Sequence, residues 1–187
     1  MKGTNTVRNL MVLPILSLLL GATLASAQVE IESFGSTIVY EPPDSAVWHL
    51  AERNYLSDRN VGYVIFKRQS ILDSTGREII PNLAIIYEEV SDSADLIVYS
   101  FLKRQNARFQ VVKVLGPDSH VFSFANAIGY EGTYPDREIP DIVHRILVGH
   151  MLHARTGLQV MGDATDEVFP KVEQEVRRFL HSVRFKE

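Results

Sequence analysis

Three histidines near the C-terminal end of the chain, His144, His150 and His153, are the residues whose type and spacing most suggest chemistry. Imidazole is the commonest metal ligand. In a strand, His144 and His150 would share a face but lie about 20 Å apart, with His153 on the opposite face. In a helix beginning at Pro140, His150 and His153 would be neighbours while His144 pointed elsewhere. Zinc needs ligands at about 2 Å, so the three cannot form one site.

We therefore interpret these histidines as surface or hydrogen-bonded side chains. One alternative stays open, a periplasmic metal-binding protein that uses His150 with His144 or His153 and distant carboxylates. No cofactor is predicted from the sequence.

The run Asp118-Ser119-His120 contains the residue types of a hydrolase triad. Adjacent residues cannot form one, because the base must reach the nucleophile while a third group orients it from behind. The chain also lacks a Gly-x-Ser-x-Gly motif. We predict no catalytic residue, and a hydrolase whose site is assembled from distant residues remains a second alternative.

Acidic residues form two clusters. Asp163, Asp166 and Glu167 lack the spaced ligands and central glycine of a calcium loop. Their position ahead of a predicted helix is explained by the helix dipole. Glu88 and Glu89 are adjacent in a predicted strand, so they face opposite sides and cannot act together on one substrate. We interpret them as a solvated strand end.

Tyr130 and Tyr134 are the best candidates for partner binding, in a stretch that also contains Gly129 and Gly132. Tyrosine suits recognition surfaces because it combines apolar area with a hydroxyl group. The polar, proline-bounded loop predicted over residues 133–140 could border the same surface.

The N-terminus has the pattern of an export signal. Lys2 and Arg8 precede an apolar run over residues 10–20, and Ala25-Ser26-Ala27 places small residues at the positions that a signal peptidase recognises. The run is shorter than the roughly 20 apolar residues of a membrane-spanning helix. We predict a signal peptide over the first 27 residues, a single domain over residues 28–187, and a periplasmic or extracellular location.

The composition limits the function. Hydrophobic residues make up 45% of the chain, which is typical of a globular protein. The formal net charge is −4, which disfavours nucleic-acid binding, because that requires a basic face. The chain has no cysteine. Disulfides, thiol nucleophiles, iron–sulfur clusters and a lipoprotein anchor are therefore excluded.

Short β-prone runs alternate with turn residues along the chain. They predict strands at residues 31–40, 48–54, 62–68, 83–87, 109–115, 121–130, 142–152 and 158–161. Residues 83–87 are apolar at every position, which predicts an interior strand with both faces covered. Trp48 is expected in the core.

Two helices are predicted. The first has Ser93 as N-cap and an apolar face formed by Ala94, Ile97, Val98, Phe101 and Leu102. The second spans residues 169–183, where apolar residues recur at spacings of three and four. Most connections between strands are short, so we expect an α+β fold. Its central, mostly antiparallel sheet would carry helices on both faces, as an α/β/α sandwich.

Several local phrases accompany this order of elements. They are Tyr40-Glu41-Pro42-Pro43 ahead of Trp48, the runs at 81–86 and 127–130, and the closing runs at 162–169 and 182–185. Together they resemble the PsbP-like superfamily, which includes the extrinsic photosystem II subunit, the Ran-binding Mog protein and exported bacterial domains. The resemblance implies a sheet with helices on both faces, and a role in binding or assembly rather than catalysis.

These observations lead to a main hypothesis of an exported, non-catalytic binding or assembly module. Its partner is expected to be another envelope protein or complex. Neither a nucleic acid nor a membrane anchor is expected once the signal peptide has been removed.

Overall fold

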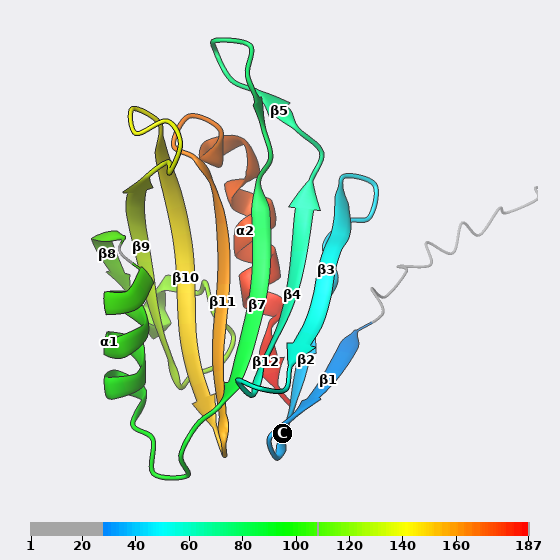
Figure 1. Ribbon diagram of the computed structural model, residues 1–187, viewed down its shortest axis with the longest axis vertical. Helices are drawn as coiled ribbons and strands as arrows, with labels where there is room; N and C mark the ends of the chain where they lie inside the picture. Colours follow the sequence, from blue (N-terminus) through cyan, green and yellow to red (C-terminus); the bar gives the residue numbers. More distant parts are fainter. Residues whose placement is uncertain (1–27, 108, 187) are drawn as a thin grey trace, which may run out of the picture.

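The computed structural model describes residues 28–107 and 109–186, so the predicted signal peptide lies outside the described residues (Figure 1). Seven strands form the main sheet: β3 (Trp48–Leu56), β4 (Val61–Arg68), β7 (Asn82–Glu89), β8 (Gln110–Leu115), β9 (Ala127–Pro135), β10 (Val143–His153) and β11 (Thr156–Thr165). A second sheet contains β1 (Val29–Ser33), β2 (Ser36–Tyr40) and β12 (Arg184–Phe185). The remaining elements are the β5 (Ile71–Leu72) and β6 (Glu78–Ile79) hairpin and the helices α1 (Leu96–Ala107) and α2 (Phe169–Ser182).

The main sheet has the order β3-β4-β7-β11-β10-β9-β8, and every neighbouring pair is antiparallel. After β7 the chain crosses through α1 to the far edge of the sheet. It then returns strand by strand from β8 to β11, which pairs with β7. The prediction of an α+β fold with a mostly antiparallel sheet is confirmed.

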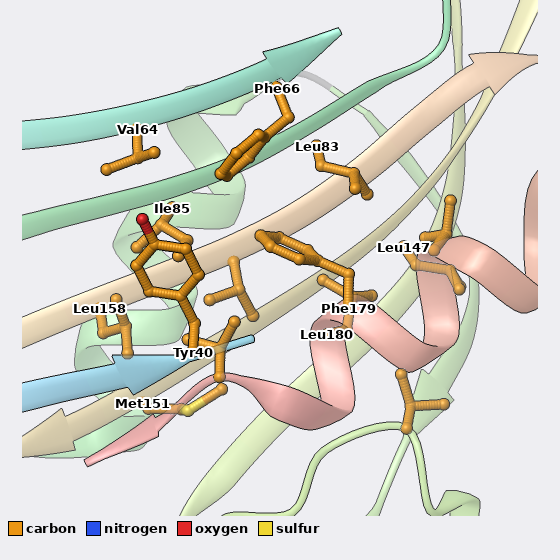
Figure 2. Close-up of a cluster of buried hydrophobic side chains, with 14 of the residues drawn as sticks. Tyr40, Val64, Phe66, Leu83, Ile85, Leu147, Met151, Leu158, Phe179 and Leu180 are labelled. Atoms are coloured by element: carbon orange, nitrogen blue, oxygen red, sulfur yellow. The ribbon is translucent and has the colours of Figure 1, made fainter. Parts of the chain in front are cut away.

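The core lies on one face of this sheet, where α2 and the small second sheet pack (Figure 1). Phe179 of α2 contacts Tyr40 of β2 and Phe66 of β4, with ring centroids 6.3 and 5.7 Å apart. Figure 2 shows these rings beside Leu83 and Ile85 of β7. Trp48 is buried in the same core, as predicted.

The other face of the sheet is covered only in part. In Figure 1, α1 lies in front of the β9 and β10 side, and neither helix of the described residues covers β7 and β4 on that face. Ala84 and Ile86 of β7 and Ile65 of β4 are partly exposed there. The interior position predicted for residues 83–87 is correct, but the expected coverage of both faces, and with it the complete α/β/α sandwich, is not seen. The pattern of apolar residues cannot predict this incomplete cover, because a strand with one face partly exposed can be as apolar as a strand with both faces covered.

Two predicted strands have different boundaries. Residues 31–40 form a hairpin, β1–β2, because Phe34 and Gly35 adopt φ values of 38° and 85°. Positive φ at both central residues is what a two-residue type I′ turn requires. Residues 121–126 precede β9 as a loop in which Val121 is buried. The strand β9 also continues to Pro135, so the loop that was expected over residues 133–140 begins only after that residue.

Candidate functional site

The helix α1 is rotated relative to the sequence prediction. Its buried residues are Tyr99 and Ser100. The predicted core face is turned to solvent instead, with exposed fractions of 70% for Ile97, 56% for Val98, 46% for Phe101 and 51% for Leu102. We call these four residues the outer face of α1. The N-cap also differs, since the carboxylate of Asp95 accepts hydrogen bonds from the backbone N–H groups of residues 97 and 98.

Contacts beneath Tyr99 explain part of this rotation. The ring of Tyr99 packs on Gly157 of β11, where an added Cβ would lie 2.7 Å from a ring carbon. Its hydroxyl donates to the Glu88 carboxylate at 2.8 Å, and Lys103 pairs with the same carboxylate. Glu88 is therefore an ion-paired residue beneath α1 rather than the solvated strand end that we predicted.

Ser100 provides the second anchor of α1. Its Oγ is fully buried and lies 2.9 Å from Nδ1 of His150 and 2.8 Å from the hydroxyl of Tyr130. Three elements, α1, β9 and β10, are thus joined by one chain of hydrogen bonds. Burying these polar groups is tolerable because they satisfy one another.

His150 is neutral in this environment. Only 1% of the residue is exposed, and burial lowers its pKa to about 4, with Lys103 and Arg104 acting in the same direction. A neutral imidazole offers one donor and one acceptor nitrogen.

The Ser100–His150 pair resembles a nucleophile and its base, which bears on the alternative of a hydrolase. A substrate carbonyl cannot reach the Ser100 Oγ, because this serine has no exposed surface. No carboxylate of the described residues hydrogen-bonds to the imidazole to orient it, as a triad requires. Asp118, Ser119 and His120 lie elsewhere, where Ser119 bonds back to the Gly116 carbonyl.

A second polar cluster lies at the other end of β10. His144 bonds to Asp163 at 3.3 Å and to Asp136 at 3.1 Å, and Tyr134 stacks on its ring at 4.9 Å. The hydroxyl of Tyr134 donates to the same Asp163 oxygen at 2.7 Å. The bond to Asp163 raises the pKa of His144, and Asp136 acts in the same direction. This cluster is an internal network that uses Asp163 as a strand residue.

The predicted role of the acids at the second helix is therefore wrong. Asp163 belongs to β11, Asp166 pairs with Arg145, and Glu167 accepts hydrogen bonds from Ser74. The N-cap of α2 is Val168, which makes no side-chain capping bond. These partners are distant in the sequence, and none of the three acids lies in the first turn of α2.

The three candidate histidines do not meet. The segment is a strand, so His144 and His150 share the α1 side of the sheet, as predicted for that case. His153 lies on the other side, where Ser36 and Phe185 contact it. Among residues 28–107 and 109–186, no three His, Asp or Glu side chains are arranged to hold a metal ion.

Between the two polar clusters lies a pocket of about 200 Å³, at the C-terminal end of α1. We call it the α1 pocket. Its wall is mainly apolar, formed by Phe109, Ile146, Val148 and Met161, with His150 and Gln159 as polar groups. The ring of Phe109 packs directly on Gly132, because a Cβ added at this glycine would lie 2.3 Å from the ring.

The structure brings together four of the five candidate residues on the α1 side of the sheet. Tyr134 and His150 line the α1 pocket, while Tyr130 and His144 belong to its two flanking networks. Tyr130 is 7% exposed, so it supports α1 rather than a partner surface. The exposure of the outer face of α1 and the burial of Ser100 were not predicted from the sequence. The sequence would have indicated a buried Ser100 only if the side of the helix that contains Tyr99 and Ser100 had been assigned to the sheet.

No family model matches this chain, and no curated protein matches its sequence. Among solved structures, the fold is similar to the crystal structure of LpqN, a protein involved in cell envelope biogenesis of Mycobacterium tuberculosis. The TM-score is 0.50 at 14% sequence identity, over 86% of this chain and 91% of LpqN. This likeness concerns the fold. Within the described part of the chain, no helix is both long and apolar enough to cross a membrane.

Proposed function

We propose that this chain is an exported, non-catalytic binding or assembly module with a PsbP-like fold. It docks on another envelope protein through the outer face of α1. The observation that carries the proposal is the exposure of Ile97, Val98, Phe101 and Leu102 on one helix face. The similarity to LpqN supports a role in the cell envelope, because LpqN itself takes part in envelope biogenesis.

The outer face is held outward by its own anchors. The hydrogen bonds of Tyr99 and Ser100 tie the opposite side of α1 to the sheet, so these apolar residues cannot turn inward without breaking them. Apolar side chains gathered on a surface mark interaction sites more often than scattered ones do. Helix faces of this kind dock into apolar grooves of partner proteins.

A cationic side chain, Arg104, lies at the end of the outer face and indicates which charge the partner surface carries there. The guanidinium of Arg104 lies 5.7 Å from the ring of Phe101 and 5.5 Å from that of Tyr130, and the side chain is half-exposed. A guanidinium stacked on aromatic rings is preorganised for a carboxylate. The partner surface is therefore apolar at its centre, with an acidic side chain at the rim that pairs with Arg104.

The test replaces the centre of the outer face with charge. The double variant Val98→Glu/Leu102→Glu is expected to abolish capture of the partner from the native envelope fraction, whereas Gln174→Glu, at an exposed position of α2, preserves capture. Captured proteins are quantified against the wild-type chain, and the bound partner is expected to protect α1 from hydrogen exchange.

Two outcomes contradict the proposal. Equal capture by the double variant excludes the outer face as the docking surface. A wild-type dimer in light scattering that the double variant makes monomeric identifies a second copy as the occupant. The same fractionation tests export, with the chain expected in the envelope fraction and its N-terminus at Gln28.

A further inference from the structure

The α1 pocket has the features of a small-molecule site that is separate from the outer face of α1. Apolar walls surround a few polar groups, which is the usual composition of ligand pockets. Its volume of about 200 Å³ is small. An apolar cavity of about 150 Å³ holds one benzene molecule, so one substituted ring, or a group of similar size, fits here.

His150 supplies the polar group at the wall of this pocket. The residue is 99% buried overall, and it lines the pocket. Nδ1 is engaged by Ser100, whereas the described residues provide no hydrogen bond to Nε2. A ring nitrogen that no described residue engages, on a residue at the pocket wall, is available to a ligand.

The hydrogen-bond chain behind His150 determines what Nε2 offers. The hydroxyl of Tyr130 has the Ser100 Oγ as its acceptor, because no other acceptor among the described residues bonds to it. If Tyr130 donates to Ser100, then the single proton of Ser100 goes to Nδ1 of His150. A neutral imidazole that accepts at Nδ1 carries its proton on Nε2. We therefore assign the proton of His150 to Nε2, which leaves one donor on the ring that no described residue occupies.

The composition of the wall selects against a charged ligand, because an unpaired charge is costly beside apolar side chains, and Lys103 and Arg104 near His150 do not line the pocket. Asp163 lines the pocket, and its carboxylate is already bonded to Tyr134 and His144. A carboxylate beside an apolar wall repels a second anion. A ligand that accepts a hydrogen bond from His150 and avoids an unfavourable charge at the wall is uncharged and carries an acceptor oxygen.

We propose that the α1 pocket binds a small, uncharged, mainly apolar molecule whose carbonyl oxygen accepts a hydrogen bond from Nε2 of His150. The apolar part of the ligand lies between Phe109 and Met161. Aromatic rings make favourable contacts with both types of side chain.

Three probes of similar size test this chemistry, with binding followed by NMR of the 15N-labelled chain. Acetophenone has a ring and a carbonyl, ethylbenzene lacks the oxygen, and benzoate carries a charge. Acetophenone is expected to give saturable shifts at pocket residues, with affinity roughly fivefold above that of ethylbenzene, the effect of one hydrogen bond. Benzoate is expected to bind more weakly than acetophenone.

Two variants and one spectrum make the test decisive. Met161→Trp fills the pocket without touching His150 and is expected to abolish acetophenone binding, whereas Ile65→Trp, half-exposed on the same sheet face two strands away, preserves it. Long-range 1H–15N spectra are expected to show His150 protonated at Nε2.

Several results overturn the proposal. A proton on Nδ1 removes the donor from the pocket, and equal binding of ethylbenzene removes the role of the oxygen. Tighter binding of benzoate overturns the uncharged ligand, and binding that survives Met161→Trp places the site elsewhere. None of these results bears on docking through the outer face of α1.

Discussion

At the scale of single residues, His150 couples the helix α1 to the sheet through an uncharged ring. A protonated imidazole at this position would be buried close to Lys103 and Arg104, both of which lower its pKa. In the proposed tautomer, the nitrogen that would gain the second proton, Nδ1, is also the one that accepts from Ser100. Protonation therefore weakens the anchor of α1.

We predict that protonation of His150 makes the free energy of unfolding depend on pH. Its folded pKa of about 4 is below the ordinary value of 6.5, so between these pH values the unfolded chain binds the extra proton. The stabilisation is present above pH 6.5 and is lost as the pH falls toward 4, by up to about 3 kcal/mol. Urea unfolding of the wild type and of His150→Gln between pH 4 and 7 measures it.

The variant is expected to show a flatter dependence, whereas His49→Gln, at an exposed position on β3, keeps the wild-type slope. The histidine His144 acts in the opposite direction. Its raised folded pKa gives stability that is present at low pH and is lost as the pH rises through that pKa. A slope that His150→Gln leaves unchanged would assign the dependence to other groups.

At the scale of elements, the rotation of α1 decides which side chains face the sheet. The aliphatic residues of this helix would gain free energy from burial, but the side that faces the sheet contains the hydrogen-bonding partners of Glu88, Tyr130 and His150. Turning the helix would leave those buried polar groups without partners, which costs about 1–3 kcal/mol for each group. The specific contacts therefore prevail over the apolar periodicity.

Gly157 is expected to be essential for this orientation. In Gly157→Ala the new Cβ would meet the ring of Tyr99 at 2.7 Å, so the ring must shift and the helix with it. Overpacking of this kind costs about 1–3 kcal/mol, to be measured by urea unfolding together with hydrogen exchange of α1. Gly116→Ala, where an added Cβ meets nothing within 4 Å, should cost little. Equal effects of the two substitutions would contradict the role of Gly157.

At the scale of the whole molecule, the two faces of the sheet carry different kinds of side chains. The face covered by α2 and the second sheet contains the large apolar cluster of Figure 2. The α1 face contains polar networks, a pocket and half-exposed strand residues. Stability therefore resides mainly on the α2 face, which leaves the α1 face available for binding.

This division predicts unequal effects of truncation on the two helices. Phe179→Ala removes a buried ring that contacts Tyr40 and Phe66, and is expected to cost about 3–5 kcal/mol in the free energy of unfolding. Leu102→Ala, on the outer face of α1, is expected to change it by less than about 0.5 kcal/mol. A large loss from Leu102→Ala would mean that α1 packs by its apolar side after all.

Several features of the fold were predictable because they depend on neighbours in the sequence. The strand β7, the helix α2 and the separation of His153 from His150 all follow from local periodicity, which is the same in the isolated segment and in the folded chain. The strand geometry also correctly indicated that the three histidines cannot share a site.

By itself, the sequence determined which segments are apolar and the type of most elements, though not all of their boundaries, because these properties are encoded within a few adjacent residues. Only the tertiary structure decided the rotation of α1, the partners of Ser100 and His150, and the incomplete cover over β7. Those features depend on contacts between residues such as Tyr99 and Gly157, which are far apart in the chain. The apolar pattern of α1 is the same whether the helix faces the core or the solvent, so periodicity could not distinguish a packing face from a docking face.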